Sequence, residues 1–170
     1  MNNHGKRVMG IGNACIASSV APLIEWIIPD YLSLEEAATM PVVYLTSLYA
    51  LFVKAKLKKG DSILIHSGSG GVGHAAIHLC QARGIIVFTT CSSGKIEYIK
   101  HRFGLDDRYI GSNRDTSFYD KIMTETQGKG VDCILNSLSD DLLQKSFQVI
   151  AEYGNFCEIG KYDLVNNTKI

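Results

Sequence analysis

A six-residue run in the first half of the chain, Gly68-Ser69-Gly70-Gly71-Val72-Gly73, has the spacing G-x-G-x-x-G. It directly follows the apolar stretch Ile63 to His66, which predicts a strand, and a helix is expected from Gly71. In that context the glycines permit a tight turn, close approach of a pyrophosphate, and close packing of helix on strand. We expect amides around Gly70 and Gly73, with the helix dipole, to bind phosphate. The alternative is a glycine-rich turn without a ligand.

A second candidate segment, Cys91-Ser92-Ser93-Gly94-Lys95, follows the predicted strand Ile85 to Thr90. Sites for NAD usually place Asp or Glu at this point to hold the ribose hydroxyls, and this segment has no carboxylate. Hydroxyl groups and a lysine suit a 2′-phosphate instead, so Ser92, Ser93 and Lys95 predict NADPH rather than NADH. The alternative for Lys95 is a solvated side chain at the start of a helix.

A third candidate is Lys161, which follows the last predicted strand, Asn155 to Ile159. Open α/β sheets carry their functional groups at the carboxyl ends of parallel strands. An ammonium group there could stabilise developing negative charge, or donate a proton if its pKa were lowered. The alternative is a surface lysine in a turn, which is where most lysines lie.

No metal site is predicted. His74 and His78 have the i, i+4 spacing of zinc ligands, but position 75 is Ala instead of the glutamate of H-E-x-x-H, and no third ligand is evident. The five cysteines, at positions 15, 80, 91, 133 and 157, include no CxxC pair. Their odd number and the apolar surroundings of three of them predict reduced, buried thiols and a cytoplasmic protein.

The elements needed to position these groups alternate along most of the chain. Short apolar strands alternate with helices of about a dozen residues, which indicates a parallel sheet covered on both faces, a doubly wound α/β fold of the Rossmann type. Five strands are predicted, at residues 62–65, 85–90, 108–110, 131–135 and 155–159, with helices at 71–83, 95–103, 118–126 and 142–150.

The first part of the chain has a different pattern. Residues 7–10 and 25–29 resemble short strands, and about 30 residues of this kind are too few for a domain. Ser33 to Glu36 fits a capping box, which predicts a short helix to about Thr39, and a longer helix is predicted over residues 42–56.

Composition excludes several classes of protein. The 170 residues include 17 Lys and Arg and 17 Asp and Glu, so the chain lacks the basic excess of a surface for nucleic acid or anionic membranes. No apolar run approaches the roughly 18 residues of a membrane helix, and the N-terminus lacks the apolar core of a secretory signal.

Several motifs together resemble a known family. Residues 33–41 and 44–51 resemble the medium-chain dehydrogenase/reductase superfamily. Residues 66–73, 114–118, 128–132, 135–138 and 156–161 narrow the resemblance to the enoyl reductase domain of animal-type fatty acid synthases and their polyketide synthase relatives. The resemblance covers nearly the whole chain.

This resemblance implies an NADP-binding domain at residues 31–170, lacking its last strands, and the end of a GroES-like substrate barrel at residues 1–30. It implies reduction of the 2,3 double bond of an enoyl thioester on an acyl carrier protein in fatty acid synthesis, with NADPH and no metal. Other synthase domains and a second copy of the parent protein would be the partners. The cofactor residues would be Thr46, Gly68, Ser69, Gly70, Gly71, Val72, Gly73, Ser92, Ser93, Lys95 and Asn136, with Thr46 and Asn136 near the nicotinamide, and Lys161 would be the proton donor.

Two rival functions stay open at this point. The first is a zinc-free quinone or alkenal reductase of the same superfamily, which would share the glycine run and the parallel sheet but not the thioester substrate. The second is a non-catalytic fragment that binds nucleotide or supports a larger assembly.

Overall fold

The computed structural model describes residues 4–13 and 17–166, so Cys15 lies outside the described residues. The chain forms two compact units, residues 1–46 and 47–170. In the first unit, strands β1 (Val8–Ile11) and β2 (Ile24–Ile27) pair in antiparallel fashion, which confirms the two predicted strands. Their assignment to a GroES-like barrel stays a prediction.

The helix α1 (Leu34–Ala38) begins at the predicted capping box, which is confirmed. The Ser33 hydroxyl accepts a hydrogen bond from the Glu36 amide at 3.0 Å, and the Glu36 carboxylate accepts one from the Ser33 amide at 2.9 Å. These bonds lower the pKa of the Glu36 carboxyl group below its usual value, because they favour its ionised form.

The second unit is built on a parallel sheet of five strands in the order β5-β4-β3-β6-β7. From the central strand β3 the chain proceeds through β4 to β5, then returns to the other side of β3 for β6 and β7. This reversal confirms the predicted doubly wound fold. The strands are β3 (Ser62–Ile65), β4 (Ile86–Cys91), β5 (Ile110–Ser112), β6 (Val131–Asn136) and β7 (Ile150–Glu158).

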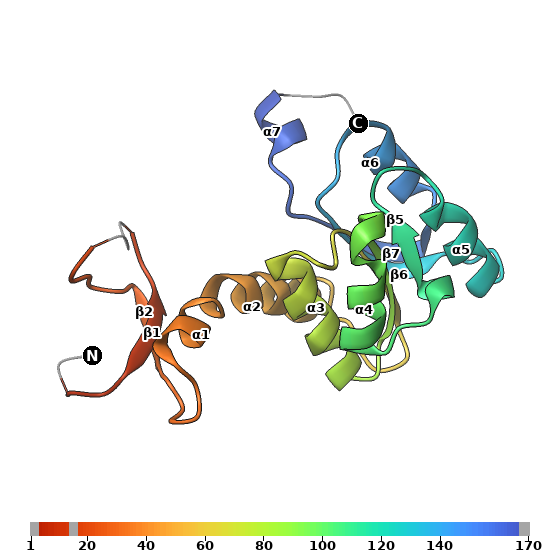
Figure 1. Cartoon of the computed structure of the whole chain (residues 1–170). Helices are drawn as coiled ribbons and strands as arrows, with labels where there is room; N and C mark the ends of the chain where they lie inside the picture. The colour runs from red at the N-terminus through yellow and green to blue at the C-terminus, as the bar shows by residue number, and fades with distance from the viewer. Residues whose placement is uncertain (1–3, 14–16, 167–170) are drawn as a thin grey trace. The chain divides into compact units, whose positions relative to one another are not determined.

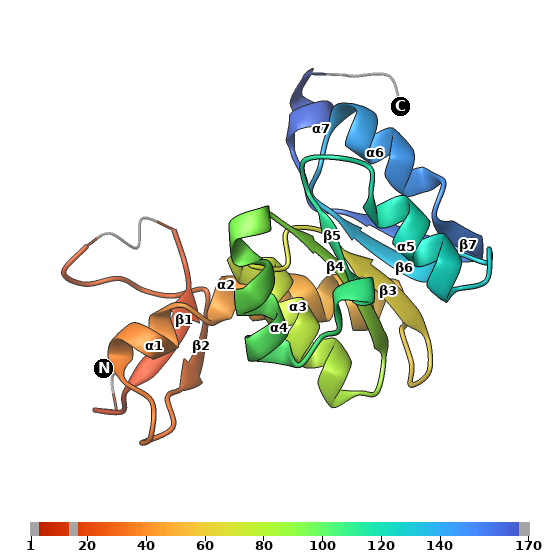
Figure 2. The same ribbon diagram turned by 45° about the vertical axis from the view of Figure 1, so that its right-hand side comes forward.

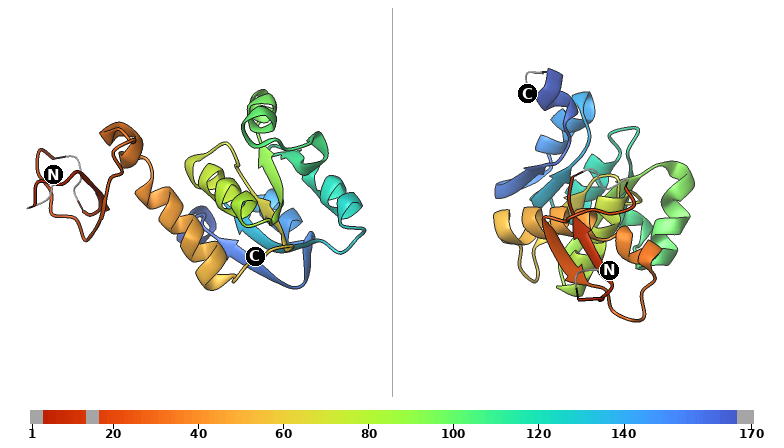
Figure 3. Two further views of the ribbon diagram at one scale, coloured as in Figure 1. Left: turned by 90° about the horizontal axis from the view of Figure 1, so that it is seen from below. Right: turned by 90° about the vertical axis from the view of Figure 1, so that its left-hand side faces the viewer.

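Helices cover both faces of this sheet (Figure 1 and Figure 2). Ile63 and Ile65 of β3 pack in one buried cluster with α3, α4 and the π-helix η1, whereas Leu64 between them packs in a second cluster with α5 and α6. Figure 3 (left) shows α3 and α5 on opposite sides of the sheet. The helices are η1 (Tyr49–Lys54), α3 (Gly71–Ala82), α4 (Ile96–Phe103), α5 (Phe118–Glu125), α6 (Asp140–Phe147) and the short α7 (Tyr162–Asn166).

The predicted long helix over residues 42–56 is only partly confirmed. The chain is α-helical in α2 (Pro41–Leu48) and then widens into η1, where the Ala55 amide bonds the Ala50 carbonyl at 2.9 Å, five residues back. The apolar spacing of the sequence does not distinguish a π-helix from an α-helix, because it reports the buried face and not the hydrogen-bond partner.

Two predicted strand boundaries are wrong. Residues 107–109 form the 3₁₀ helix η3, because the Asp106 carboxylate accepts the Arg108 amide at 3.1 Å, and β5 therefore begins at Ile110 and not at residue 108. The last strand begins at Ile150, within the range predicted as helix, and it carries an irregularity opposite β6. Tyr153 in this strand has a φ of 63°, so the strand bends locally there. The bend interrupts the residue pattern by which a strand is recognised in the sequence.

The two predicted buried thiols Cys80 and Cys133 are confirmed, whereas Cys157 is only half-buried. Of the helices in the described residues, none is long and apolar enough to cross a bilayer.

His66, the residue after β3, is 3% exposed, and burial lowers its pKa from 6.5 to about 3. Between these two pH values the unfolded chain binds a proton at this side chain and the folded chain does not. The folded state is therefore favoured above about pH 6.5, and this advantage is lost as the pH falls toward 3.

We expect acid to destabilise the wild-type chain more steeply than a His66→Gln variant, by up to about 1.4 kcal/mol per pH unit in this window. Urea unfolding of both chains at neutral pH and near about pH 5 measures this difference. An equal loss of unfolding free energy in the two chains would contradict a neutral, buried His66.

Candidate functional site

The glycine run forms the turn between β3 and α3. Ser67 begins this turn with a φ of 55°, a left-handed conformation that costs a non-glycine residue about 1–2 kcal/mol. The Gly68 amide donates to the Thr90 carbonyl at 2.8 Å, so the turn is tied to the end of the neighbouring strand β4. The Gly70 amide donates back to the Ser67 carbonyl at 2.8 Å, and α3 starts at the next residue.

Two positions in this turn have no room for a side chain. A Cβ on Gly73 would lie 2.7 Å from the Gly68 Cα and closer still to the Ser67 carbonyl oxygen. A Cβ on Gly68 would collide with the Thr89 hydroxyl and lie 3.0 Å from the Ile77 side chain. The predicted reasons for the first and third glycines, a tight turn and close packing of helix on strand, are therefore confirmed.

The start of α3 offers amides for an anion. Within the described residues, the amides of Ser69, Gly71, Val72 and Gly73 donate to no protein acceptor, and the first bond of the helix is made by the His74 amide to the Gly70 carbonyl at 2.8 Å. The positive end of the helix dipole reinforces these donors.

The Gly70 amide is not among these donors, because it already closes the turn on Ser67. The Ser47 hydroxyl donates to the Val72 carbonyl at 3.2 Å, which anchors the first helical turn without using its amides.

The turn lies at the switch point of the sheet. β3 pairs with β4 on one side and β6 on the other, and the strand order reverses here, where open α/β sheets bind their ligands. The loops at the carboxyl ends of β3 and β6 meet, since the Ser137 hydroxyl donates to the Ser67 hydroxyl at 3.2 Å.

The segment after β4 presents its polar groups to solvent. Ser93 and Lys95 form the exposed 3₁₀ helix η2 (Ser93–Lys95), and Ser92 before it is half-buried. Glu97, the first carboxylate after the strand, forms an ion pair with Lys100 at 3.1 Å, so it has a partner already.

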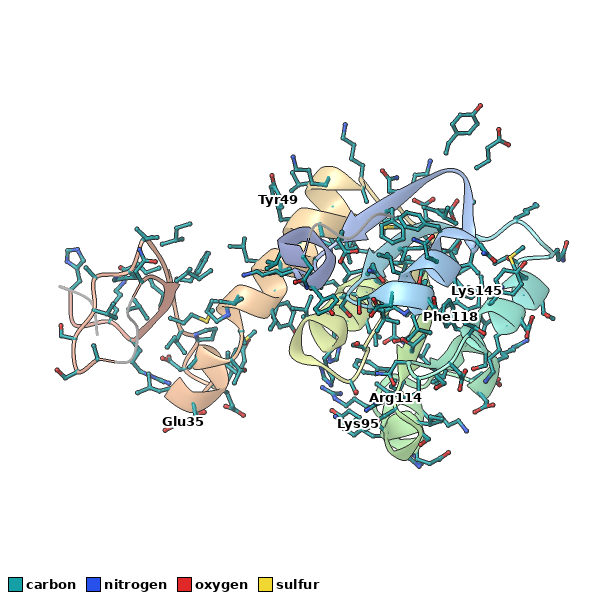
Figure 4. All side chains as sticks on the ribbon, turned by 90° about the horizontal axis from the view of Figure 1, so that it is seen from above. Glu35, Tyr49, Lys95, Arg114, Phe118 and Lys145 are labelled. Atoms are coloured by element: carbon teal, nitrogen blue, oxygen red, sulfur yellow. The ribbon has the colours of Figure 1, made fainter. Side chains whose placement is uncertain are left out.

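Arg114 is a candidate that sequence reasoning missed. It follows β5, which pairs with β4 so that Ser112 lies opposite Cys91, and its loop therefore adjoins the loop of Lys95. Figure 4 shows both cations on the same side of the domain. Neither makes an ion pair with a carboxylate of the described residues.

Arg114 was overlooked because the strand before it was predicted to end at residue 110. In the structure β5 ends at Ser112, which places Arg114 just beyond its carboxyl end.

A cavity of about 560 Å³ lies beside Arg114. It is within the range of small-molecule sites, and it opens between the loops that follow β5 and β6. Hydrogen bonds from Ser117 lower the pKa of the Asp115 carboxyl group, so this wall of the cavity is acidic at neutral pH. The lining residues are Arg114, Asp115, Thr116, Ser137, Leu138, Ser139, Asp140, Asp141 and Leu142.

Asn136 is fully buried at the end of β6, where its amide group is already bonded. Its side-chain nitrogen donates to the Leu138 carbonyl at 2.8 Å and to the Glu158 carboxylate at 2.6 Å. Glu158 also accepts the Gly160 amide at 2.5 Å, so it ties β6 to the turn that leads to Lys161. Sequence reasoning missed Glu158, whose role depends on a partner 22 residues away.

Lys161 is exposed and follows β7, so its predicted place at the carboxyl edge of the sheet is confirmed. The Lys161 carbonyl accepts a hydrogen bond from the Val165 amide at 2.9 Å, at the start of α7. This bond does not involve the Lys161 side chain. Thr46 lies in α2 and is half-buried. The nicotinamide contacts expected of Thr46 and Asn136, and the proton donation expected of Lys161, stay predictions.

The described residues contain no group of three or more His, Cys, Asp or Glu side chains able to hold a metal ion. His78 lies 3.1 Å from the Arg102 guanidinium, and both His78 and His74 have their pKa lowered, mainly by burial. A cation beside the ring opposes metal binding there.

Comparison with known proteins finds a protein family whose sequence model matches this chain. The model of the zinc-binding dehydrogenase family matches residues 71–169. The chain is 44% identical over 169 residues to the lovastatin diketide synthase of Aspergillus terreus, covering 98% of this chain. It spans only 7% of the length of that synthase.

Solved structures share the fold. The crystal structure of the CurK enoyl reductase is 39% identical, with a TM-score of 0.77 over 81% of this chain and 40% of that one. A mycobacterial protein complexed with NADPH is 26% identical, with a TM-score of 0.73 over 82% of this chain and 43% of that one.

We expect Gly73→Ala to lower the free energy of unfolding by about 1–3 kcal/mol, because the added methyl group has no space against Ser67 and Gly68. Gly94→Ala is the matched control, since a Cβ there meets nothing within 4 Å, and its effect should stay within about 0.5 kcal/mol. Urea unfolding measures both, and equal stability of the two variants would contradict the close approach of α3 to the turn.

Proposed function

Because the chain belongs to the zinc-binding dehydrogenase family, and within it matches the enoyl reductase domains of polyketide synthases, we propose that it binds NADPH for the reduction of an enoyl thioester. The observation that carries this proposal is the set of unbonded amides at the start of α3, located at the switch point of the sheet. A diphosphate is the ligand that such a turn and helix terminus favour.

The residues present fit the cofactor. The amides of Ser69 and residues 71–73 would bind the pyrophosphate, and the cavity beside Arg114 would accept the adenosine. Lys95 and Arg114, on adjoining loops, would pair with the 2′-phosphate, helped by the hydroxyls of Ser92 and Ser93.

The bound cofactor would supply a hydride to the β-carbon of the substrate. The protein must then stabilise negative charge on the thioester oxygen and deliver a proton to the α-carbon. Lys161 is our candidate for this role, since its ammonium lies at the carboxyl edge that also carries the glycine turn. Glu158 would act indirectly, by holding the turn before Lys161. We assign no role to zinc, for which the described residues offer no ligand set.

The setting of the reaction is part of the proposal. The relatives reported above favour a polyketide synthase over the fatty acid synthase named first by the sequence motifs. An acyl carrier protein would present the substrate, other synthase domains would be neighbours in the same polypeptide, and the parent protein would be a cytoplasmic homodimer.

We expect Lys95→Ala and Arg114→Ala each to weaken NADPH binding by about tenfold or more, with little effect on NADH, because each removes a cation that only the 2′-phosphate needs. The matched control is Lys129→Ala, an exposed lysine just before β6 and so at the opposite edge of the sheet. Calorimetric titration of the chain with each nucleotide measures the affinities. An equal loss for NADH and NADPH would contradict this assignment of the cations.

We expect a complete enzyme containing this chain to reduce crotonyl-CoA, followed as loss of NADPH absorbance, and to leave free quinones unreduced. Lys161→Ala should lower turnover by about 10²-fold or more and change NADPH affinity little. Lys161→Arg keeps the charge but cannot give up a proton, so it separates charge stabilisation from proton donation. Unchanged turnover in Lys161→Ala would remove this lysine from the mechanism, and reduction of quinones alone would overturn the thioester substrate.

A further inference from the structure

A buried chain of hydrogen bonds begins beneath the glycine turn at His66. The His66 Nδ1 atom lies 3.0 Å from the Thr90 hydroxyl, and its Nε2 atom lies 2.8 Å from the Ser146 hydroxyl. Thr90 Oγ1 also accepts the Ser67 amide at 3.3 Å, and Ser146 donates to the Leu142 carbonyl at 2.7 Å. The imidazole thus connects the first residue of the turn to α6.

The directions of these bonds assign the tautomer of His66. A carbonyl can only accept, so the single hydroxyl proton of Ser146 goes to Leu142, and Ser146 must accept from Nε2–H. Nδ1 is then the acceptor for the Thr90 hydroxyl, whose remaining lone pair accepts the Ser67 amide. With the proton on Nδ1 instead, the Thr90 hydroxyl proton would lose this acceptor in a buried site.

The ring is fixed in this orientation by its surroundings. Its edge-to-face contact with Phe118 has a centroid distance of 5.1 Å and an interplanar angle of 79°. Burial lowers the pKa of His66 to about 3, so the ring is neutral at physiological pH. In this arrangement every side-chain nitrogen and oxygen of His66, Thr90 and Ser146 has a hydrogen-bond partner.

Ser67 is the residue that this series of hydrogen bonds holds in place. Its φ of 55° is unfavourable for a residue with a side chain, and its amide is held by Thr90. Its carbonyl accepts the Gly70 amide and lies against Gly73, so any rotation of Ser67 displaces the start of α3.

We propose that His66 is a positioning residue for the pyrophosphate-binding turn: as the Nε2–H tautomer it orients the Thr90 hydroxyl, which holds Ser67 in the left-handed conformation that aims the free amides of α3. This inference rests on the proposed function only in taking NADPH as the ligand. The arrangement of the side chains is a property of the chain without ligand.

Three variants test the proposal. Thr90→Val keeps the shape of the side chain and removes the hydroxyl, whereas Thr90→Ser removes only the methyl group. Thr89→Val is the matched control. Thr89 is also buried at the end of β4, and its hydroxyl also bonds a backbone carbonyl, that of Ile65 at 2.8 Å, but it has no bond to Ser67 or His66. Its side chain lies against Gly68, and valine keeps the shape that Gly68 packs against.

Calorimetry with the 170-residue chain gives the first result. NADPH affinity should fall about tenfold or more in Thr90→Val, and by less than about threefold in Thr90→Ser and Thr89→Val. Adenosine 2′-monophosphate, which has no pyrophosphate, should bind all four chains equally. If Thr90→Val and Thr89→Val weaken NADPH binding equally, or if Thr90→Ser fails to restore it, the inference is overturned and the proposed function stands.

Nitrogen-15 NMR of the ligand-free chain gives the second result and keeps the two proposals separate. The His66 ring should carry its proton on Nε2, and the Ser67 amide should be protected from exchange in wild type and Thr89→Val but not in Thr90→Val. A proton on Nδ1, or equal protection in all chains, overturns the inference even if the variants bind poorly or unfold in part. If the wild-type chain has the proton on Nε2 and a protected Ser67 amide but does not bind NADPH, only the proposed function is overturned.

Discussion

The structure depends on the close approach of the first turn of α3 to the carbonyl of Ser67. Only glycine at position 73 permits this approach, and Ser67 must adopt a left-handed backbone to make it. The same geometry leaves the first amides of α3 without internal partners. A constraint of packing between a strand and a helix thus leaves free hydrogen-bond donors of the kind that suit an anion, at the point where the strand order of the sheet reverses.

The surroundings of this turn differ on its two sides. Toward β4 and β5 lie the exposed cations Lys95 and Arg114, and the cavity beside Arg114 opens between the loops that follow β5 and β6. Toward β6 and β7 the polar groups are bonded to one another, as Asn136 is to Glu158. Glu158 also accepts the Gly160 amide, so it holds the turn that leads to Lys161.

Much of the fold follows from local pattern. The strand β3 and the helices α3 and α5 were predicted within one residue, because continuous apolar runs and glycine punctuation report burial and turns directly. The predicted location of Lys161 at a strand end is also confirmed. The errors concern β5 and β7, where an aspartate cap and a bend in the strand override the apolar pattern.

The rest of the site could not be predicted, because it depends on contacts between residues distant in sequence. Nothing local distinguishes Thr90, bonded to His66, from Thr89, bonded to Ile65. The Gly70 amide closes the turn on the Ser67 carbonyl, a pairing that the glycine spacing alone does not indicate. Sequence periodicity reports which residues are buried, but the partner of each polar group is decided by the packed structure.

The central claim is that the amides at the start of α3 bind the pyrophosphate, and an amide NMR titration of the chain with NADPH tests it most directly. We predict that the amide resonances of Ser69, Gly71, Val72 and Gly73 shift most, and that the Gly70 amide, bonded within the turn, shifts least. Shifts that spare these four amides while appearing elsewhere, or their protection from exchange in the free chain, would contradict the account.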